Sequence, residues 1–86
     1  MPEISRFFGI VVSMYFDDHG PPHVHARYGS DVVRVAIETT QILSGSLPPR
    51  ALALLLEWMV IHRVELDDDW SRARSGRPLA PIDPLR

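Results

Sequence analysis

The sequence predicts an α+β fold in which a three- to four-stranded antiparallel sheet packs through one face on one long C-terminal helix. Aromatic and β-branched residues dominate residues 4–38, with short turns between the runs. From Leu52 onward, apolar residues recur at helical spacing. The chain has 86 residues, enough for one modest core. We therefore expect a single domain over residues 1–75, followed by an extended, proline-rich tail over residues 76–86.

The first predicted strand covers residues 4–16, and its alternation produces one strongly apolar face. That face carries Phe8, Ile10, Val12, Met14 and Phe16. Residues 17–22 follow as a stiff loop, because Pro21 and Pro22 each fix their own φ and restrict the residue before them. Together with Asp18, these prolines predict a structural loop that holds its flanking side chains at low entropic cost.

Residues 23–28 and 31–38 predict a hairpin joined by Gly29-Ser30 as a type II′ turn. If the turn is only these two residues, Tyr28 pairs with Asp31 and the register follows by counting. One face then pairs Ala26 with Val33 and Val24 with Val35, and the other pairs His25 with Arg34 and His23 with Ala36. The hairpin therefore has one apolar face and one face that carries two histidines and two arginines.

Thr39-Thr40 predicts another reversal, and residues 41–43 predict a short fourth strand. Pro48 and Pro49 are tolerated only in the first turn of a helix, so the helix begins there. Gly76 and Pro78 end it near residue 75, which predicts one helix over residues 48–75. Its main apolar stripe contains Leu52, Leu55, Trp58, Met59, His62, Leu66 and Trp70.

The same helix carries more apolar surface than one sheet face can cover. Leu54, Ile61 and Val64 form one further strip, and Leu56 and Val60 form another. We therefore expect a homodimer, or a complex with a second protein, through this helix. In the tail, Leu79, Ile82 and Leu85 either cover this surface in the same chain or contact the partner.

Composition excludes several classes of protein. The chain has no cysteine, which rules out disulfides and thiolate metal sites. Its formal net charge of −2 argues against a general nucleic-acid coat but allows a local basic face. We expect no signal peptide and no membrane span, because no basic patch precedes an apolar stretch and the longest apolar run is short. These features favour a cytoplasmic protein.

The histidine-rich run from Asp17 to Ala26 is the main candidate site. His23 and His25 lie two residues apart on a strand, so their side chains point the same way, about 7 Å apart. They can act as general acid and base without a metal. Alternatively they can bind a divalent transition metal with a third ligand, His19 or Asp18. The same histidines also fit a structural role in the loop.

Arg27, Arg34 and His62 complete the candidate residues. Arg27 and Arg34 share the histidine face and are expected to bind phosphate. His62 is a third candidate catalytic residue, with Glu65 and Asp69 within helical reach. Since the apolar hairpin face packs on the helix, His23 and His25 point away from His62. The four histidines then meet only at a sheet edge or across a dimer interface.

The chain resembles the domain-of-unknown-function family 4160 over nearly its whole length. The resemblance rests on residues 1–10, on Asp17-Asp18-His19-Gly20-Pro21-Pro22-His23-Val24-His25-Ala26, and on Leu55-Leu56-Glu57-Trp58 with His62-Arg63, Glu65-Leu66 and Trp70. It implies a small bacterial protein whose signature histidines match His19, His23, His25 and His62. Val24 and Asp69 stand where many members have phenylalanine and asparagine. Genes of the family often lie beside those of another small family, numbered 2442, in arrangements suggestive of toxin–antitoxin modules.

We therefore expect a component of a two-gene, toxin–antitoxin-like module that acts through a protein partner. In its enzymatic form it is a ribonuclease without a cofactor, with His23 and His25 as acid and base and RNA as the ligand of Arg27 and Arg34. The partner is a second copy or the neighbouring gene's small protein. A metal-binding module with His19, His23 and His25 as ligands, and a purely structural interaction module, are the alternatives.

Overall fold

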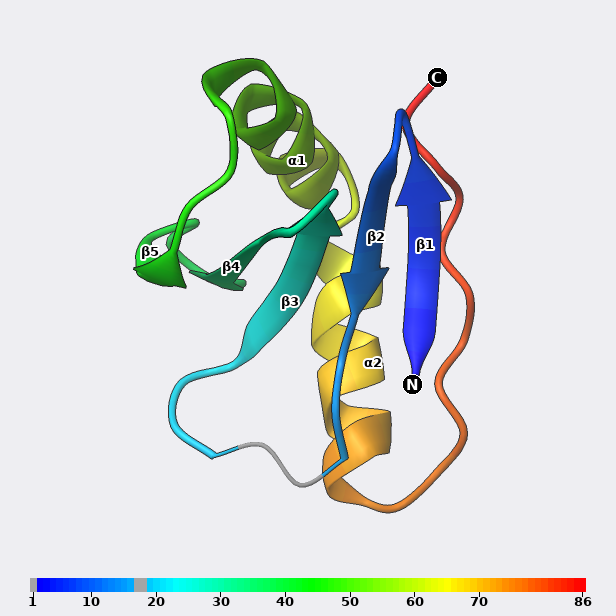
Figure 1. The fold of residues 1–86 in the computed structure, drawn as a ribbon. Helices are drawn as coiled ribbons and strands as arrows, with labels where there is room; N and C mark the ends of the chain where they lie inside the picture. Colours follow the sequence, from blue (N-terminus) through cyan, green and yellow to red (C-terminus); the bar gives the residue numbers. More distant parts are fainter. Residues whose placement is uncertain (1, 17–18) are drawn as a thin grey trace.

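A computed structural model describes residues 2–16 and 19–86 and has five strands and two helices. The strands are β1 (Glu3–Phe7), β2 (Ile10–Ser13), β3 (His23–Tyr28), β4 (Asp31–Ala36) and β5 (Ile42–Gly45), and the helices are α1 (Pro49–Ile61) and α2 (Arg63–Arg74). The strands form one antiparallel sheet in chain order (Figure 1). The α+β class is thus confirmed, whereas the expected three to four strands and single helix are corrected to five and two.

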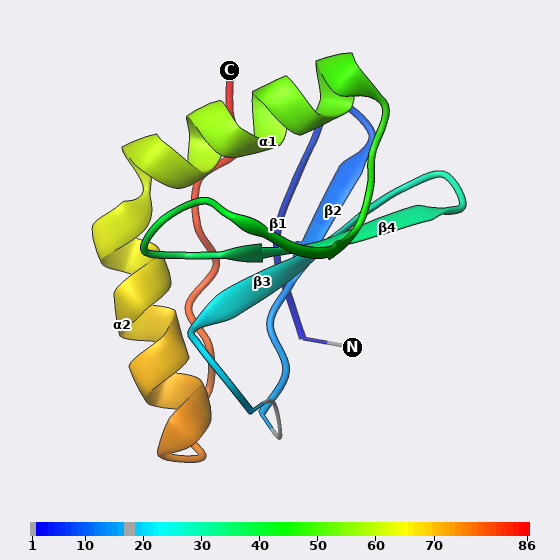
Figure 2. The same cartoon turned by 90° about the vertical axis from the view of Figure 1, so that its left-hand side faces the viewer.

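Both helices lie on the same side of the sheet, and no helix of the described chain covers the other side (Figures 1 and 2). The side chains between sheet and helices form one apolar core. It includes Ile10, Val12, Val24, Val33, Val35, Leu55, Trp58, Met59, Leu66 and Trp70. None of the helices in the described residues is long and apolar enough to span a bilayer.

The predicted single strand over residues 4–16 is wrong, because a tight turn at Phe8-Gly9 divides it into β1 and β2. Both turn residues have positive φ angles, 49° for Phe8 and 82° for Gly9, as a type I′ hairpin turn requires. Phe7 consequently pairs with Ile10. Ile10, Val12 and Met14 remain in the core as predicted, while Phe8 and Phe16 are exposed.

The predicted β3–β4 register is confirmed at every pair. Tyr28 lies opposite Asp31, and His25 lies opposite Arg34. The neighbouring strands differ slightly from expectation: β4 ends at Ala36, and β5 covers Ile42–Gly45 instead of residues 41–43. The hairpin therefore sets its apolar face as the sequence predicts. Of the four residues expected on the other face, His23 is instead buried, and its ring packs against Trp70 of α2.

The predicted single helix is also wrong, because the chain bends at His62. This residue has φ −107° and ψ 25°, which lies outside the α region, and it separates α1 from α2. A straight helix over residues 48–75 would be about 40 Å long at 1.5 Å per residue. The longest extent of the molecule is only 33 Å. The bend turns α2 sharply away from α1 and lets both helices contact the same core (Figure 2).

The C-terminal tail runs alongside β1 within the same chain (Figure 1). The Ile82 N–H donates to the Ile4 carbonyl at 2.8 Å, and the Trp58 indole N–H donates to the Asp83 carbonyl at 2.8 Å. Ile82 and Leu85 are buried in the core. Of the two roles expected for the tail, the structure therefore has it docked on its own domain, where it closes the β1 edge of the sheet.

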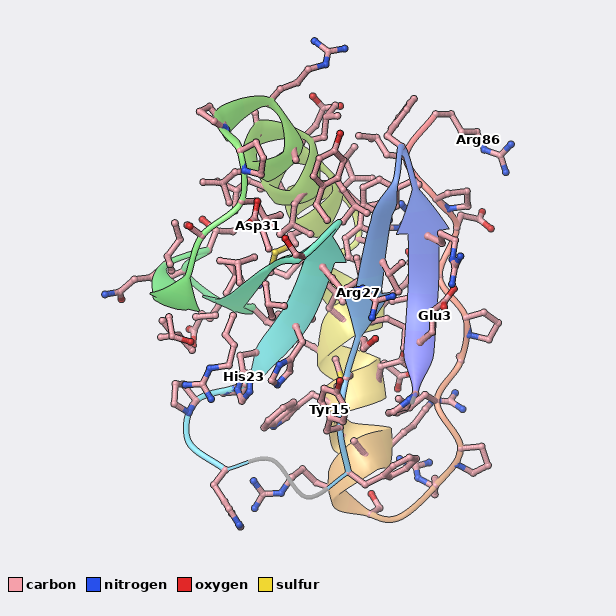
Figure 3. The ribbon with its side chains drawn as sticks, in the orientation of Figure 1. Glu3, Tyr15, His23, Arg27, Asp31 and Arg86 are labelled. Carbon is pink, nitrogen blue, oxygen red and sulfur yellow. The ribbon has the colours of Figure 1, made fainter. Side chains whose placement is uncertain are left out.

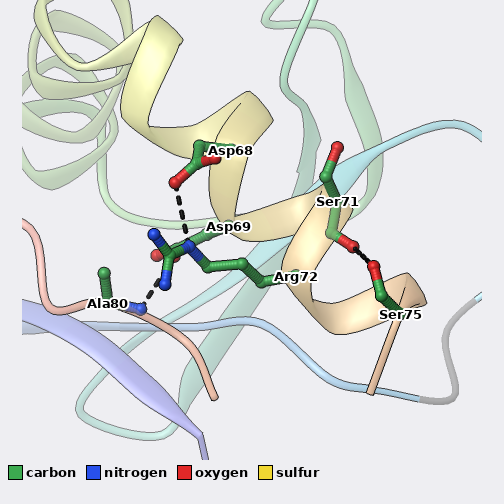
Figure 4. Close-up of polar contacts among 6 residues, drawn as sticks. All are labelled: Asp68, Asp69, Ser71, Arg72, Ser75 and Ala80. Atoms are coloured by element: carbon green, nitrogen blue, oxygen red, sulfur yellow. Dashed lines mark hydrogen bonds and ion pairs between the residues drawn. The ribbon is translucent and has the colours of Figure 1, made fainter. Parts of the chain in front are cut away.

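Asp69 connects α2 to this tail from a buried position. Its side chain is only 1% exposed, and its Oδ1 accepts the Ala80 N–H at 2.8 Å (Figure 4). Its Oδ2 has no hydrogen-bond partner among the described residues. Burial raises the pKa of this carboxyl above its ordinary value, although the Ala80 hydrogen bond and nearby Arg72 oppose the shift.

This shift predicts that Asp69→Asn stabilises the fold at neutral pH. Because the folded-state pKa is the higher one, the contribution of Asp69 to stability is fully present below its unfolded pKa and is lost as pH rises through its folded pKa. An amide has no charge to bury, so the variant should lose less stability than the wild type as pH rises above the ordinary pKa of an aspartate. Urea unfolding at several pH values measures this. A wild-type-to-variant difference that does not change with pH would contradict it.

Candidate functional site

The uncovered side of the sheet, here called the open face, is organised in two cross-strand rows. One row runs Arg6, Val11, Arg27 and Val32, and the other runs Glu3, Ser13, His25, Arg34 and Ser44. Directly opposite residues in an antiparallel pair lie on the same face, so their side chains are neighbours. Figure 3 shows Glu3 and Arg27 in front of the strands, away from the helices. Three arginines and one histidine thus share this surface with a single glutamate.

His25 lies at the centre of the open face. The Tyr15 ring meets it edge-on, with the ring centroids 4.5 Å apart, and the His23 ring lies 5.2 Å away. Beside it is a shallow cavity of about 110 Å³. This volume is well below the roughly 300–1,000 Å³ of sites for whole drug-sized ligands. The cavity therefore fits one group of a larger molecule. Its lining is Val11, Ser13, Tyr15, His25, Ala26, Arg27 and Val32.

The two predicted phosphate-binding arginines flank His25. Arg34 lies directly across from His25 on β4, and its Nε donates to the Ser44 hydroxyl at 3.0 Å. This hydrogen bond orients the guanidinium along the surface. Arg27 is exposed two residues further along β3, near enough to Glu3 to help lower the pKa of that carboxyl, although Arg6 has the larger effect. An anion on the open face would therefore meet two guanidinium groups beside one imidazole.

His23 differs from His25 because it is buried, with only 1% of its surface exposed. It begins β3, and its ring packs against Trp70 of α2 at 5.4 Å. Its Nδ1 lies 2.8 Å from the Pro21 carbonyl oxygen. Because a carbonyl only accepts, Nδ1 is the donor, which leaves Nε2 as the basic nitrogen of the neutral ring. His23 therefore joins the proline loop, the sheet and α2.

His62 lies apart from this cluster, at the bend between the helices. Its Nδ1 is 2.6 Å from Glu65 Oε1, and its ring lies 5.5 Å from that of Trp58. The expected orientation of His62 by Glu65 is therefore present. Asp69, the other expected neighbour, instead bonds Ala80. The structure therefore brings His23 and His25 together, with ring centroids 5.2 Å apart, whereas His62 lies at the helix bend beside Trp58 and Glu65.

The proposed metal ligands are likewise not gathered. His19 is exposed, whereas His23 is buried, and within residues 2–16 and 19–86 no three histidine, aspartate or glutamate side chains are placed to hold a metal ion. Asp18 lies outside the described residues. At the end of the loop, the Pro21 carbonyl accepts from His23 and the Pro22 carbonyl accepts from the Ile37 N–H.

Several residues of the site could not be nominated from sequence. Tyr15 and Ser13 reach His25 through the β2–β3 pairing, which lies across the loop and has no two-residue turn to set its register. Ser44 meets Arg34 because β5 begins and ends later than expected. The sequence does contain one signal for them: Ser13 and Tyr15 alternate with apolar residues, which places both on the outward face of their strand.

Comparisons with known proteins identify a family but no function. No curated protein and no solved structure matches the chain. A protein-family model described as "Domain of unknown function (DUF4160)" matches residues 9–71. This region includes the loop histidines, the β3–β4 hairpin and the bend at His62. Since the match covers most of the 86 residues, the chain belongs to this family of domains of unknown function.

Proposed function

We propose that this protein binds and cleaves RNA on the open face, as one component of a two-gene, toxin–antitoxin-like module. The observation that carries the proposal is the placement of His25 directly across from Arg34, with Arg27 beside it, on the side of the sheet that the helices leave uncovered. An imidazole can act as general base, and guanidinium groups can stabilise the charge on a phosphate in the transition state, without a metal ion.

In this reaction Arg27 and Arg34 bind the phosphate oxygens and stabilise the charge that develops in the transition state. His25 takes the proton of the ribose 2′-hydroxyl, whose oxygen attacks phosphorus. The bond to the 5′-oxygen breaks, and water protonates that oxygen. The products are a 2′,3′-cyclic phosphate and a 5′-hydroxyl end. His23 does not contact substrate in this scheme, because it is buried; it positions His25 by ring contact.

The two-gene module and the cytoplasmic location belong to the same proposal. The module derives from the family resemblance, and the location is supported by the absence of cysteine and of an expected signal peptide. The partner, the neighbouring gene's small protein, is proposed to bind an apolar surface at the helix bend, formed by Val60, Ile61 and Val64. These three side chains are 68%, 61% and 82% exposed. Exposed aliphatic side chains clustered on both sides of a bend are a suitable interface core.

A second candidate function is a structural interaction module without catalysis. The burial of His23 between Trp70 and the Pro21 carbonyl favours this alternative, because a histidine so placed contributes to the fold. In that case His25 and the arginines form only a solvated surface. The two functions differ in what the half-buried His25 and the buried His23 contribute.

Histidine 25 and arginine 34 should be required for activity but not for folding. Expression of the wild type is expected to arrest growth, and the purified protein is expected to cleave cellular RNA in the presence of a chelator. His25→Ala should lower cleavage about 100- to 10,000-fold, the usual contribution of a general base. Arg34→Ala should weaken RNA binding and also lower the rate at which bound RNA is cleaved.

Arg74→Ala is the matched control, because Arg74 is an exposed arginine at the end of α2. Arg74→Ala should leave both RNA cleavage and RNA binding unchanged. Harmless expression of the wild type together with intact cellular RNA would refute the nuclease.

His23→Ala should instead lower stability. Removing its ring leaves the Pro21 carbonyl without its donor and opens a space beside Trp70, so we expect a loss of about 1–3 kcal/mol. His25→Ala should lower the free energy of unfolding by less than His23→Ala does, because the His25 ring is only half-buried. Chemical denaturation of both variants measures this. Equal losses of unfolding free energy in the two variants would contradict this prediction, because the two histidines would then contribute equally to the fold.

Val64→Asp tests the partner surface. At 82% exposure the substitution should leave folding intact, but it should weaken binding to the neighbouring gene's protein at least about tenfold, because a charge is desolvated in the interface. Calorimetric titration of the two purified proteins measures this. Arg77→Asp, at an exposed position in the tail, is the control. Unchanged affinity for Val64→Asp would place the partner elsewhere.

A further inference from the structure

The cavity beside His25 is lined largely by aliphatic and aromatic side chains. Val11 and Val32 belong to this lining and flank Arg27 in one cross-strand row of the open face. Tyr15 and His25 also belong to it, and their rings meet edge-on. Such a lining suits a flat, uncharged ring, whereas a phosphate binds where cationic groups and hydrogen-bond donors converge. Of the groups in RNA, the base is therefore the one that this cavity suits.

The open face offers few cationic groups for the phosphates of a long duplex. Arg6 is already paired with Glu3, whose carboxylate lies 2.8 Å from the guanidinium. Arg27 and Arg34 are the arginines that flank His25. Proteins bind duplex RNA mostly through its phosphates and 2′-hydroxyls, because its bases are paired and stacked inside. Affinity gained in this way rises with the number of phosphates neutralised, so two arginines would bind a duplex only weakly.

We propose that the substrate is single-stranded RNA and that the base of the nucleotide carrying the attacking 2′-hydroxyl occupies this cavity. This assignment rests on the proposed function, in which His25 takes the proton of that hydroxyl. The base and the 2′-hydroxyl are attached to the same ribose, so a base in a cavity lined by His25 brings its own hydroxyl to the imidazole. A paired base can enter the cavity only after it leaves the duplex, which costs unstacking and unpairing energy.

Tyr15 supplies the aromatic wall on which the base stacks. It follows the end of β2 at Ser13, and its ring is half-buried, so part of the ring remains accessible. Stacking of a base on an aromatic side chain strengthens binding on the order of tenfold, and it tolerates any base because every base has a π face. Tyr15 should therefore contribute affinity for single strands without a strong sequence preference.

Fluorescence anisotropy with 2′-fluoro RNA tests this assignment, because the probe has no 2′-hydroxyl and the proposed reaction cannot cleave it. A short single strand should bind the wild-type protein at least about tenfold more tightly than the same strand annealed to its complement. Tyr15→Leu removes the ring but keeps an apolar side chain, and it should abolish most of this difference. Tyr15→Phe keeps the ring and should retain the difference. Cleavage of unmodified single-stranded and duplex RNA is measured in parallel.

Phe8→Ala is the matched control, because Phe8 is an aromatic residue that is 58% exposed at the β1–β2 turn, outside the cavity lining. It should leave both affinities unchanged, and circular dichroism checks that every variant is folded. The comparison of single strand with duplex on the wild type does not depend on any variant.

The outcomes separate this assignment from the nuclease itself. Equal affinity for single strand and duplex, or a preference that survives Tyr15→Leu, overturns the base site even if the protein cleaves RNA. A single-strand preference that depends on the Tyr15 ring, without cleavage of unmodified RNA, supports the base site and refutes the nuclease. If neither form of the probe binds, the base site is wrong.

Discussion

The register of the β3–β4 hairpin is the constraint on which the rest of the structure depends. Side chains alternate between the two faces of a strand, so a slip of one residue would exchange the faces completely. In the observed register, Val24 and Val35 face the helices and His25 and Arg34 face outward. The core and the candidate site are therefore two results of a single pairing. A substitution that shifts this pairing would remove both at once.

The helix bend follows from what this sheet requires. Its strands contain four to six residues each, too few to support a straight helix over residues 48–75. By bending at His62, the chain presents Leu55 and Met59 from α1 and Leu66 and Trp70 from α2 to one core. The bend also leaves Ile61 and Val64 outside. The compact core and the exposed apolar surface are thus produced by the same change of direction.

The features that could be predicted from the sequence are those that residues close together in the chain determine. The two-residue turn at Gly29-Ser30 allows only one register, so the positions of His25, Arg27 and Arg34 on a shared face could be counted directly. The turn at Phe8-Gly9 could not be predicted in the same way, since phenylalanine seldom adopts a positive φ. The bend at His62 contains neither proline nor glycine, and apolar periodicity continues across it. The burial of His23 depends on Trp70, a residue distant in sequence that only the folded chain brings near.

The hydrogen bond between Ile82 and Ile4 has a consequence for the order of folding. These residues lie near opposite ends of the 86-residue chain, so their contact closes a loop that contains the whole sheet and both helices. The entropy lost on closing a loop rises with its length, and contacts this distant are the slowest to form by chance. Once the strands and helices have formed, however, the two segments are already neighbours. We therefore expect docking of the tail to be the closing step of folding, with the β1 edge open to pairing with other chains until it occurs.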